Sequence, residues 1–379
     1  MTTTINNEHK KLNVPNLRFK EFQGEWEKKS LGEIGDSFIG LTYKPTDVVS
    51  EGGLIVFRSS NIQNGCMDYK DIVRVNKNVK EKLITKKDDL LVCARNGSAR
   101  LIGKNAILHE ADANQTFGAF MMVFRSDKNH FVHQLLNTKR YSSQVSENLG
   151  ARINQITSSD LSSFEFFFPT ENSEMNKIAA LLDLIDERIA TQNKIINKLQ
   201  SLIKGIAQKI VRSNKPNVRL FECVECSSSI LQESEVCEQG TYPVYGANGI
   251  VGYLDNYNTE GEAVYIIKDG SGVGTVSYVT GKCSATGTLN TLQAKNGYSL
   301  QYLYYLLKVF NFEPYKTGMA MPHIYFKDYG KAKFFCPSYT EQLQYAQSLS
   351  AIDSKLLVEK NILTNLTLQK QYLLRQMFI

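Results

Sequence analysis

The sequence predicts an α+β fold in which two strand-rich domains are separated by two long antiparallel coiled-coil helices, with an internal pseudo-twofold repeat. Two heptad-spaced apolar rows, a constant offset between the halves of the chain and short β-like runs ahead of each row support this prediction. A helix of this length cannot bury its apolar row alone. Each row is therefore expected to pack against the other.

The first apolar row lies between Glu174 and Arg212. Ser173 is a candidate N-cap and Pro216 ends the pattern, which predicts a helix of roughly 38 residues, about 57 Å at 1.5 Å per residue. Only Gln192 interrupts the alternating steps of four and three. The members of this row are Ile178, Leu182, Ile185, Ile189, Ile196, Leu199, Ile203, Ile206 and Ile210.

The second row repeats the first at an offset of 167 residues, with its first interruption, Glu359, at the place of Gln192. Its members are Tyr345, Leu349, Ile352, Leu356, Glu359, Leu363, Leu366, Lys370, Leu373 and Met377. Outside the row, Ala179 and Asp186 recur as Ala346 and Asp353, and at an offset of 168 Gly150, Ile156, Asp160 and Pro169 recur as Gly318, Ile324, Asp328 and Pro337. Two unrelated amphipathic helices would not produce the matches upstream of the helices. We therefore interpret the chain as two copies of one unit, a globular domain followed by a long helix.

The repeat divides the chain into five expected segments. These are an N-terminal arm over 1–16, a first strand-rich domain over 17–168, a central helix over 169–216, a second strand-rich domain over 217–336 and a C-terminal helix over 337–379. In the first domain the runs LIVFRSSNI, DIVRV, DLLVCARNG, NAILH and FGAFMMVFRS are typical of strands. HFVHQLLNTKRYSSQVSENL has helical spacing, and GARINQITSSDLSSFEFFFP is interpreted as a polar loop leading into a last strand.

The second domain follows the same plan. YPVYGANGIVGYLDN and AVYIIKDGSGVGTVSYVTGK are predicted hairpins, and SLQYLYYLLKVF is the predicted counterpart helix. Asp269, Gly270 and Ser271 are expected at the places of Asn96, Gly97 and Ser98.

Composition indicates a soluble, cytoplasmic protein. The polar N-terminus lacks an apolar core typical of a signal peptide, and no apolar run approaches the roughly 18 residues that a membrane span requires. Seven scattered cysteines fit a reducing compartment. Cys223 and Cys226 form a single CxxC without a second pair, so no metal site is expected.

Charge differs between the two domains. Residues 16–168 carry 21 Lys and Arg against 18 Asp and Glu, whereas residues 217–336 carry 9 against 11. A chain that held DNA by phosphate contacts alone would be more basic. Either the cationic residues gather on one face, or other subunits help to hold the DNA.

Motifs for enzyme activity are missing from the sequence. Gly97 to Gly103 is one residue too long for a phosphate loop, and DGSGVGTVSY lies between β-branched runs, which indicates a hairpin turn. No NPPY or DPPY segment of an amino-methyltransferase occurs. Asp88 and Asp89 would suit a metal-dependent nuclease, but a charged turn that enters a buried strand is the simpler interpretation. No catalytic residue is therefore assigned.

Polar residues beside the Gly-rich turns suit base recognition. Arg pairs with guanine edges, Asn and Gln with adenine, and small hydroxyls with either. The candidates in the first domain are Arg58, Ser59, Ser60, Asn61, Arg95, Asn96, Ser98, Arg100, Lys104, Arg152, Asn154 and Gln155. Those in the second domain are Tyr245, Asn248, Lys268, Ser271, His323 and Lys327.

Several segments follow in a fixed order over nearly the whole chain: RFKEFQGEWEKKSLGEI, NGSARLIGK, GARINQI, YPVYGANGIVGY, GMAMPHI and a twice-used ending of Pro, Glu and a long helix. In their order and duplication they resemble the specificity (S) subunit of type I restriction-modification systems. The resemblance implies two target recognition domains that each read half of a bipartite DNA site, held apart by the helices. It also implies two methyltransferase (M) subunits docked on the helices and two restriction/translocase (R) subunits, with S-adenosylmethionine, ATP and Mg on those partners and no cofactor on this chain.

Two other functions stay open from the residues alone. A free-standing DNA nuclease or methyltransferase would need the motifs that are missing. A coiled-coil adaptor that does not bind DNA would explain the helices but not the Arg and Asn clusters. The bases that are read cannot be predicted, because they depend on loop geometry.

Overall fold

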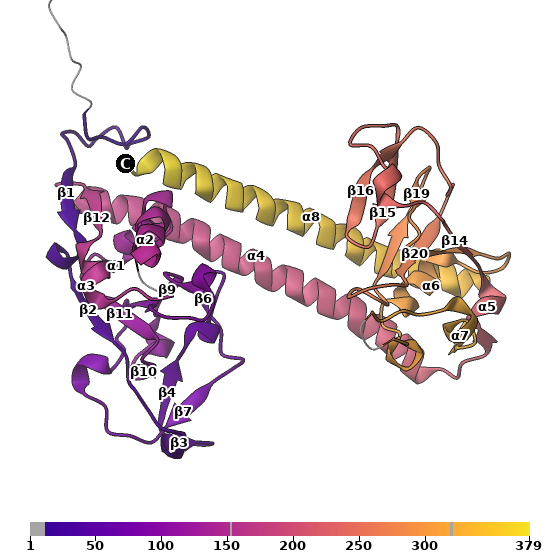
Figure 1. Cartoon of the computed structure of the whole chain (residues 1–379), viewed down its shortest axis with the longest axis horizontal. Helices are drawn as coiled ribbons and strands as arrows, with labels where there is room; N and C mark the ends of the chain where they lie inside the picture. The colour runs from indigo at the N-terminus through magenta and orange to yellow at the C-terminus, as the bar shows by residue number, and fades with distance from the viewer. Residues whose placement is uncertain (1–11, 152–153, 319–320) are drawn as a thin grey trace, which may run out of the picture. The chain divides into compact units, whose positions relative to one another are not determined.

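The structure, a computed structural model, describes residues 12–151, 154–318 and 321–379. The chain divides into two compact units, Met1–Gln192 with Ile362–Ile379, and Asn193–Asn361. Each unit contains one strand-rich domain and part of both long helices (Figure 1). The predicted α+β fold with two strand-rich domains and two long helices is confirmed.

The first domain is built on a four-stranded sheet in the order β2-β11-β8-β9, all antiparallel. Its central strand β8 is buried along its whole length, which explains the continuous apolar run LLVC. The strands of this sheet are β2 (Asp36–Ile39), β8 (Leu90–Cys93), β9 (Asn105–Ile107) and β11 (Met121–Arg125). The other strands are β1 (Glu27–Ser30) paired with β12 (Glu165–Phe168), the sheet β10 (Thr116–Phe117), β4 (Leu54–Phe57), β7 (Val73–Val75) and β3 (Val48–Val49), and the pair β5 (Ile62–Gln63) and β6 (Cys66–Met67).

The second domain repeats this topology. Its four-stranded sheet has the order β14-β20-β17-β18, and its strand β17 is again fully buried. The strands of this sheet are β14 (Val224–Ser228), β17 (Ala263–Ile267), β18 (Val276–Val279) and β20 (Leu289–Ala294). The remaining strands are β16 (Gly249–Leu254), β15 (Tyr242–Gly246) and β19 (Ser284–Ala285) in a second sheet, and β13 (Val218–Arg219) paired with β21 (Lys333–Phe334).

Strand pairing confirms the duplication beyond the order of the sheets. In each copy one short strand runs parallel to its neighbour: β10 pairs with β4, placing Phe117 opposite Phe57, and β19 pairs with β15, placing Ala285 opposite Tyr245. The turns that leave these strands also match, because Gly118 N donates to Phe57 O and Thr286 N donates to Tyr245 O, each over 2.9 Å.

Short helices depart in part from the sequence prediction. The helical stretch after β11 is divided into α1 (Asn129–Leu135) and α2 (Lys139–Ala151). The segment expected as a polar loop contains α3 (Ser158–Ser163), because Thr157 and Asp160 form a capping box at its start. The second domain has α5 (Leu220–Cys223), α6 (Leu300–Leu307), which was predicted, and α7 (Phe326–Tyr329).

The two long helices are α4 (Asn172–Ser213) and α8 (Tyr339–Met377). Ser173 lies within the first turn of α4, where its hydroxyl donates to the Glu171 carboxylate, so the predicted N-cap is wrong. Ser338 caps α8 through a reciprocal pair of bonds with Glu341. The described helices include none with the length and apolarity that crossing a membrane requires.

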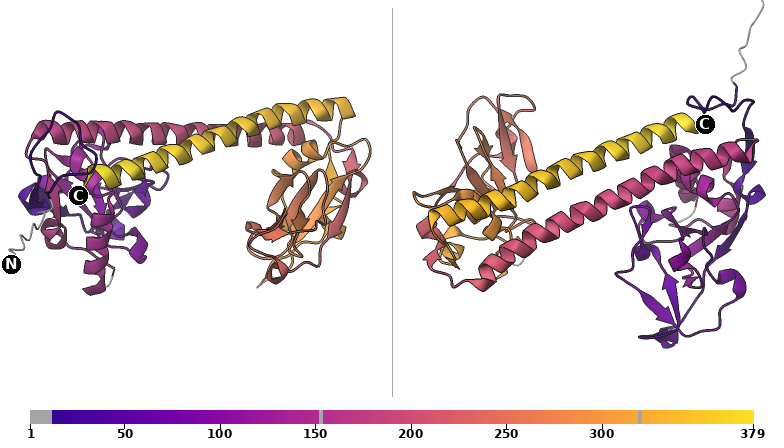
Figure 2. Two further views of the ribbon diagram at one scale, coloured as in Figure 1. Left: turned by 90° about the horizontal axis from the view of Figure 1, so that it is seen from above. Right: turned by 180° about the vertical axis from the view of Figure 1, so that it is seen from behind.

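Most members of the predicted apolar rows lie on the buried faces of these helices, although Tyr345 is 36% exposed. Six members of the α4 row and three apolar members of the α8 row are buried: Ile178, Leu182, Ile185, Ile196, Ile203, Ile210, Leu349, Leu356 and Met377. Ile189, Leu199, Ile352, Leu363, Leu366 and Leu373 are half-buried. The first unit holds the start of α4 with the end of α8, and the second holds the reverse, so the helices pack antiparallel (Figures 1 and 2).

The end of α8 completes the core of the first domain. Leu374, Met377 and Phe378 are buried there together with Trp26 and Phe131. The Phe378 ring centroid lies 6.3 Å from that of Trp26 and 5.3 Å from that of Phe131. The last residues of the chain are thus structural for the domain near its beginning.

Candidate nucleic-acid interface

Three segments that are distant in sequence meet at one edge of the first domain. The Asn96 side chain donates to Ser59 Oγ over 3.0 Å, and Lys104 Nζ donates to Ser59 O over 3.1 Å. Asn154, in the left-handed conformation that Asn tolerates (φ 53°), donates from Nδ2 to Gly97 O over 3.2 Å. We call Ser59, Arg95, Asn96, Lys104, Asn154 and Gln155 the first loop cluster.

Arg95 is the most exposed cation at the centre of this cluster. It forms an antiparallel bridge with Gln155, and its guanidinium carbon lies 5.3 Å from the centroid of the Phe120 ring. Phe120 is 58% exposed, which is unusual for a phenylalanine beside a buried strand. The sequence prediction missed Phe120 because it lies inside an apolar run. The only local signal is the Gly-Ala pair before it.

The remaining candidates of the first domain divide into two groups. Ser98 and Arg100 are exposed on the loop between β8 and β9, and burial lowers the pKa of Lys104. Asn61 is fully buried and bonds to backbone groups of its own loop, and Arg58 is paired with Asp71 over 2.8 Å. These two residues support the loop. Ser60 is half-buried, and Arg152 lies outside the described residues.

The second domain brings a different set of residues to the same edge. Asp269 forms an antiparallel bridge with His323, and the His323 ring packs edge-on against Tyr325 at a centroid distance of 5.1 Å. Lys327 Nζ lies 5.1 Å from the centroid of the Tyr325 ring. We call Lys268, Asp269, Ser271, His323, Tyr325 and Lys327 the second loop cluster.

The two other candidates of the second domain lie on its first hairpin. Asn248 is exposed at the turn between β15 and β16. Tyr245 is half-buried on β15, where burial raises the pKa of its hydroxyl.

The register between the two clusters differs by one residue from the sequence prediction. Ile156 N donates to Ala94 O, and Ile324 N donates to Lys268 O, each over 2.9 Å. Because Arg95 bridges to Gln155 and Asp269 bridges to His323, Asp269 occupies the place of Arg95 and not that of Asn96. The second copy therefore presents a carboxylate where the first presents a guanidinium.

The two equivalent loops differ in length, which explains why the sequence prediction placed Asp269 at the position of Asn96. Gly103 N donates to Cys93 O, and Gly274 N donates to Ile267 O, so the equivalent loops contain the nine residues 94–102 and the six residues 268–273. Both glycines have a positive φ, 81° for Gly103 and 88° for Gly274. A Cβ atom there would be strained, which fixes glycine at the same point in both copies.

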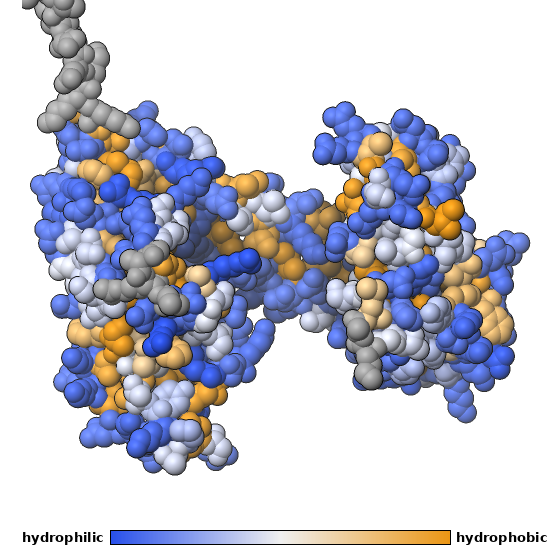
Figure 3. Space-filling model, viewed as in Figure 1, coloured by the Kyte–Doolittle hydropathy of each residue, from blue (hydrophilic) through white to orange (hydrophobic). Residues whose placement is uncertain are grey.

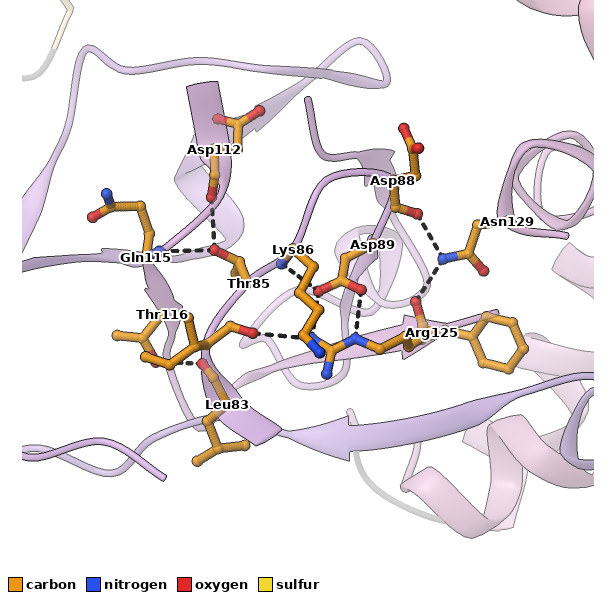
Figure 4. Close-up of polar contacts among 12 residues, drawn as sticks. Leu83, Thr85, Lys86, Asp88, Asp89, Asp112, Gln115, Thr116, Arg125 and Asn129 are labelled. Carbon is orange, nitrogen blue, oxygen red and sulfur yellow. Dashed lines mark hydrogen bonds and ion pairs between the residues drawn. The ribbon is translucent and has the colours of Figure 1, made fainter. Parts of the chain in front are cut away.

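Asp88 and Asp89 do not form a pair of free carboxylates. Asp89 is 1% exposed and accepts two bonds from Arg125, over 2.7 and 2.6 Å. Figure 4 shows the Asp89 side chain directed at Arg125, whereas Asp88 receives a bond from Asn129 through its backbone carbonyl. These contacts favour the charged turn over a metal-dependent nuclease site.

Within the described parts of the chain, no cysteine belongs to a group of three or more side chains with metal-ligand spacing. All seven cysteines are free, and Cys223 Sγ faces Cys336 Sγ at 4.0 Å in place of Cys226. Among the described residues one group, His133 with Asp183 and Asp186, has ligand-like spacing. The Lys370 ammonium already lies 2.6 and 2.7 Å from the two carboxylate oxygens of Asp186, so a cation partner is present within the protein.

The fold and the two loop clusters define a class of protein, a duplicated two-domain chain with polar recognition loops and paired helices. Residues 23–201 and 218–368 match the family described as type I restriction modification DNA specificity domain. The chain therefore belongs to this family.

Individual relatives agree with this assignment. The chain is 34% identical over 125 residues to the type I restriction enzyme EcoKI specificity subunit of Escherichia coli K12, covering 31% of this chain and 27% of that protein. It is 29% identical over 170 residues to the StySPI specificity subunit of Salmonella potsdam, covering 42% and 36%. The matches thus span about a third of the length of these relatives.

A solved structure has the same fold over the whole chain. The S subunit of a type I restriction-modification system from M. genitalium superposes with a TM-score of 0.69 at 21% identity, covering 97% of this chain and 99% of that one.

Proposed function

We propose that this chain is the DNA-recognition subunit of a type I restriction-modification complex, with residues 17–168 and 217–336 as target recognition domains that each read one half of a bipartite site. The observation that supports this most is the convergence of distant polar segments into one loop cluster in each copy. Such convergence is what base reading requires, because several side chains must meet adjacent base edges.

Recognition in the first domain uses the first loop cluster. Arg95 pairs with a guanine edge, and Asn96, Asn154 and Gln155 contact adenine or neighbouring polar edges. Ser98 and Arg100 extend this surface. The Phe120 ring positions the Arg95 guanidinium, since a guanidinium stacks favourably on an aromatic face.

In the second domain the reading surface consists of Lys268, Ser271, His323 and Lys327, with Tyr245 and Asn248 on the adjacent hairpin. This domain carries fewer cations. Binding of the DNA phosphates near the second domain therefore depends more on the other subunits than it does near the first domain.

The paired helices set the unread spacer and dock two methyltransferase subunits. Apolar side chains lie exposed along both helices, and Figure 3 shows them among hydrophilic residues. Exposed apolar groups of this kind mark interaction surfaces. Those on α4 and α8 are Leu184, Ile195, Leu202, Val211, Tyr339, Leu343, Tyr345, Leu357, Val358, Ile362, Leu368 and Tyr372.

The chain itself performs no chemistry in this proposal. Two restriction/translocase subunits complete the cytoplasmic complex, and S-adenosylmethionine, ATP and Mg bind to the partner subunits. Purified chain incubated with DNA and either magnesium or S-adenosylmethionine is expected to show neither cleavage nor methyl transfer. Turnover by the pure chain would overturn this part of the proposal.

Methylation mapping tests the recognition function. In a genome that expresses the chain with its methyltransferase partner, modified sites should share two short sequences separated by a spacer of fixed length. Modification without a shared bipartite sequence would contradict the proposal. A salt-dependent shift of duplex DNA by the complex separates it from an adaptor that does not bind DNA.

A further inference from the structure

We infer that Asp269 is a base-reading residue of the second domain and that it selects cytosine, at the position in the fold where Arg95 of the first domain selects guanine. The inference rests on the proposed function and adds a residue to it. It follows from three observations: the place of Asp269 in the repeat, the lack of a partner for its carboxylate among the described residues, and the acceptor chemistry of a carboxylate.

The place of Asp269 is fixed by its bridge partner. Residues that face each other in an antiparallel bridge direct their side chains to the same side. Arg95 and Gln155 therefore share one face in the first domain, and Asp269 and His323 share the equivalent face in the second. Each copy thus offers one charged side chain, Arg95 or Asp269, and a second polar side chain, Gln155 or His323, at the same point.

Asp269 differs from other acidic residues beside the loops. Asp71 is paired with Arg58 and Asp89 with Arg125. Asp269 is half-buried, yet within the described ranges its carboxylate has neither an ion pair nor a hydrogen-bond donor. A half-buried carboxylate without a partner costs stability, so a partner supplied from outside would recover it.

The chemistry of that partner follows from the carboxylate. An ionised carboxylate only accepts hydrogen bonds, so it needs a donor on a base edge. In the major groove the N4 amine of cytosine is the donor that Asp and Glu read, whereas guanine presents two acceptors that suit Arg. Both domains would therefore read a C·G pair in the major groove. Arg95 would contact its guanine, and Asp269 would contact its cytosine.

Neighbouring residues make a carboxylate acceptable at this surface. Lys268 precedes Asp269, and Lys327 lies over the Tyr325 ring beside His323. These cations are available for the phosphates, while Asp269 faces the bases. At a wrong sequence the carboxylate would be desolvated against an acceptor or left near phosphates, so it would also discriminate by repulsion.

The test compares variants in the assembled methyltransferase complex, with binding measured on duplexes that carry each base pair at each position of the second half-site. Asp269→Ala should lose the preference for one C·G pair by about ten-fold or more, with the other positions and the first half-site unchanged. Asp269→Asn, which is nearly isosteric, should shift the preference at that position toward adenine, because an amide pairs with the adenine edge. Arg95→Ala is the matched control and should relax one position of the first half-site only.

Unchanged base preference in both Asp269 variants would overturn the inference, even if their binding became uniformly tighter. Loss of preference at an A·T pair would overturn the assignment of cytosine. Should Asp269→Ala fail to assemble, Asp269→Asn decides the question alone. Failure of the proposed function looks different, since the wild-type complex would then show no bipartite preference at all.

Discussion

In each unit one short helix of the strand-rich domain contacts the long helices through polar side chains, and the two copies do so with different chemistry. In the first unit, His130 on α1 lies 2.6 Å from Asp183 on α4, and Gln134 donates to both Asp183 and Asp186 over 2.9 and 3.0 Å. Lys370 on α8 closes the group by its bonds to Asp186. This junction is ionic.

The second junction repeats the geometry with one longer ion pair, between Lys308 and Asp353 at 4.0 Å, and otherwise uncharged groups. Gln301 on α6 donates to Ser350 on α8 over 3.2 Å, and the Tyr305 hydroxyl donates to Asp353 over 3.2 Å. The offset of 167 residues relates Asp183 to Ser350 and Asp186 to Asp353. It also relates Lys370 to Ile203, which is buried.

The same backbone plan accepts either junction, so the close Lys370–Asp186 pair of the first unit is not needed to form the fold. The Lys370–Asp186 pair also fixes the register between α4 and α8. A shift along the helix axis would separate a partly buried lysine from its carboxylate, which costs stability. The first junction also adds a dependence on pH.

Removing residues 371–379 should give the largest effect. It takes Leu374, Met377 and Phe378 out of the first core, and each such loss costs about 2–5 kcal/mol against a typical total stability of about 5–15 kcal/mol. We expect the first unit to become sensitive to limited proteolysis while the second domain resists. Leu368→Ala, on the exposed side of the same helix, is the control. A truncated chain that melts like the wild type would contradict this role of the α8 end in the core.

Substituting Lys370 by Met should destabilise the first unit by about 2 kcal/mol, because Asp186 loses its charged donor while it stays partly buried. Combining Lys370→Met with Asp186→Leu should recover most of the loss. Urea unfolding of the single and double variants measures the coupling. If the stability loss of the double variant equals the sum of the losses of the two single variants, the two side chains do not act as a pair.

Acid should weaken the first unit more than the second. Burial, followed by the charge of Lys370, lowers the pKa of His133 to about 4 from its usual 6.5. Between these values the unfolded chain binds a proton that the folded chain does not, so stability falls as the pH drops from 6.5 toward 4, by at most about 1.4 kcal/mol per pH unit. His130 acts in the opposite sense.

The bond with Asp183 raises the pKa of His130, so its contribution is present below pH 6.5 and is lost as the pH rises through the raised value. Because His130 is about half exposed, solvent screens it and His133 dominates. Urea unfolding at several pH values should show a shallower acid loss for His133→Gln. Identical slopes for variant and wild type would contradict the assignment.

Tyr305→Phe in the second junction should have the smallest effect, about 1 kcal/mol, since it removes one hydrogen bond to Asp353. Its size should not change between pH 5 and 8. A loss as large as that of Lys370→Met would show that the second junction is not the weaker polar contact.

Much of this molecule could be predicted from periodicity. The heptad rows located both long helices, and the upstream matches located the repeat, because seam positions and Gly or Pro turns leave signals in a single sequence. Lys370 also appeared in the sequence as an interruption of the row. Its pairing with Asp186 did not, since that contact joins residues 184 positions apart.

The recognition loops were predicted as groups but not in register. The equivalence of Arg95 and Asp269 depends on their bridges to Gln155 and His323, and a loop that differs by three residues concealed it. Asn61 resembled a base reader in sequence, although its amide supports the loop from within. Phe120 could not be distinguished from its apolar neighbours, because exposure depends on the turn that carries it.

The most direct test of modular recognition is methylation mapping after exchange of residues 17–168 for the first domain of another family member. The exchanged subunit, assembled with its methyltransferase partner, should modify sites in which one half-sequence is new and the other half-sequence and the spacer length are unchanged. If both half-sequences change together, the two domains do not read independently, and modular recognition by this chain is wrong.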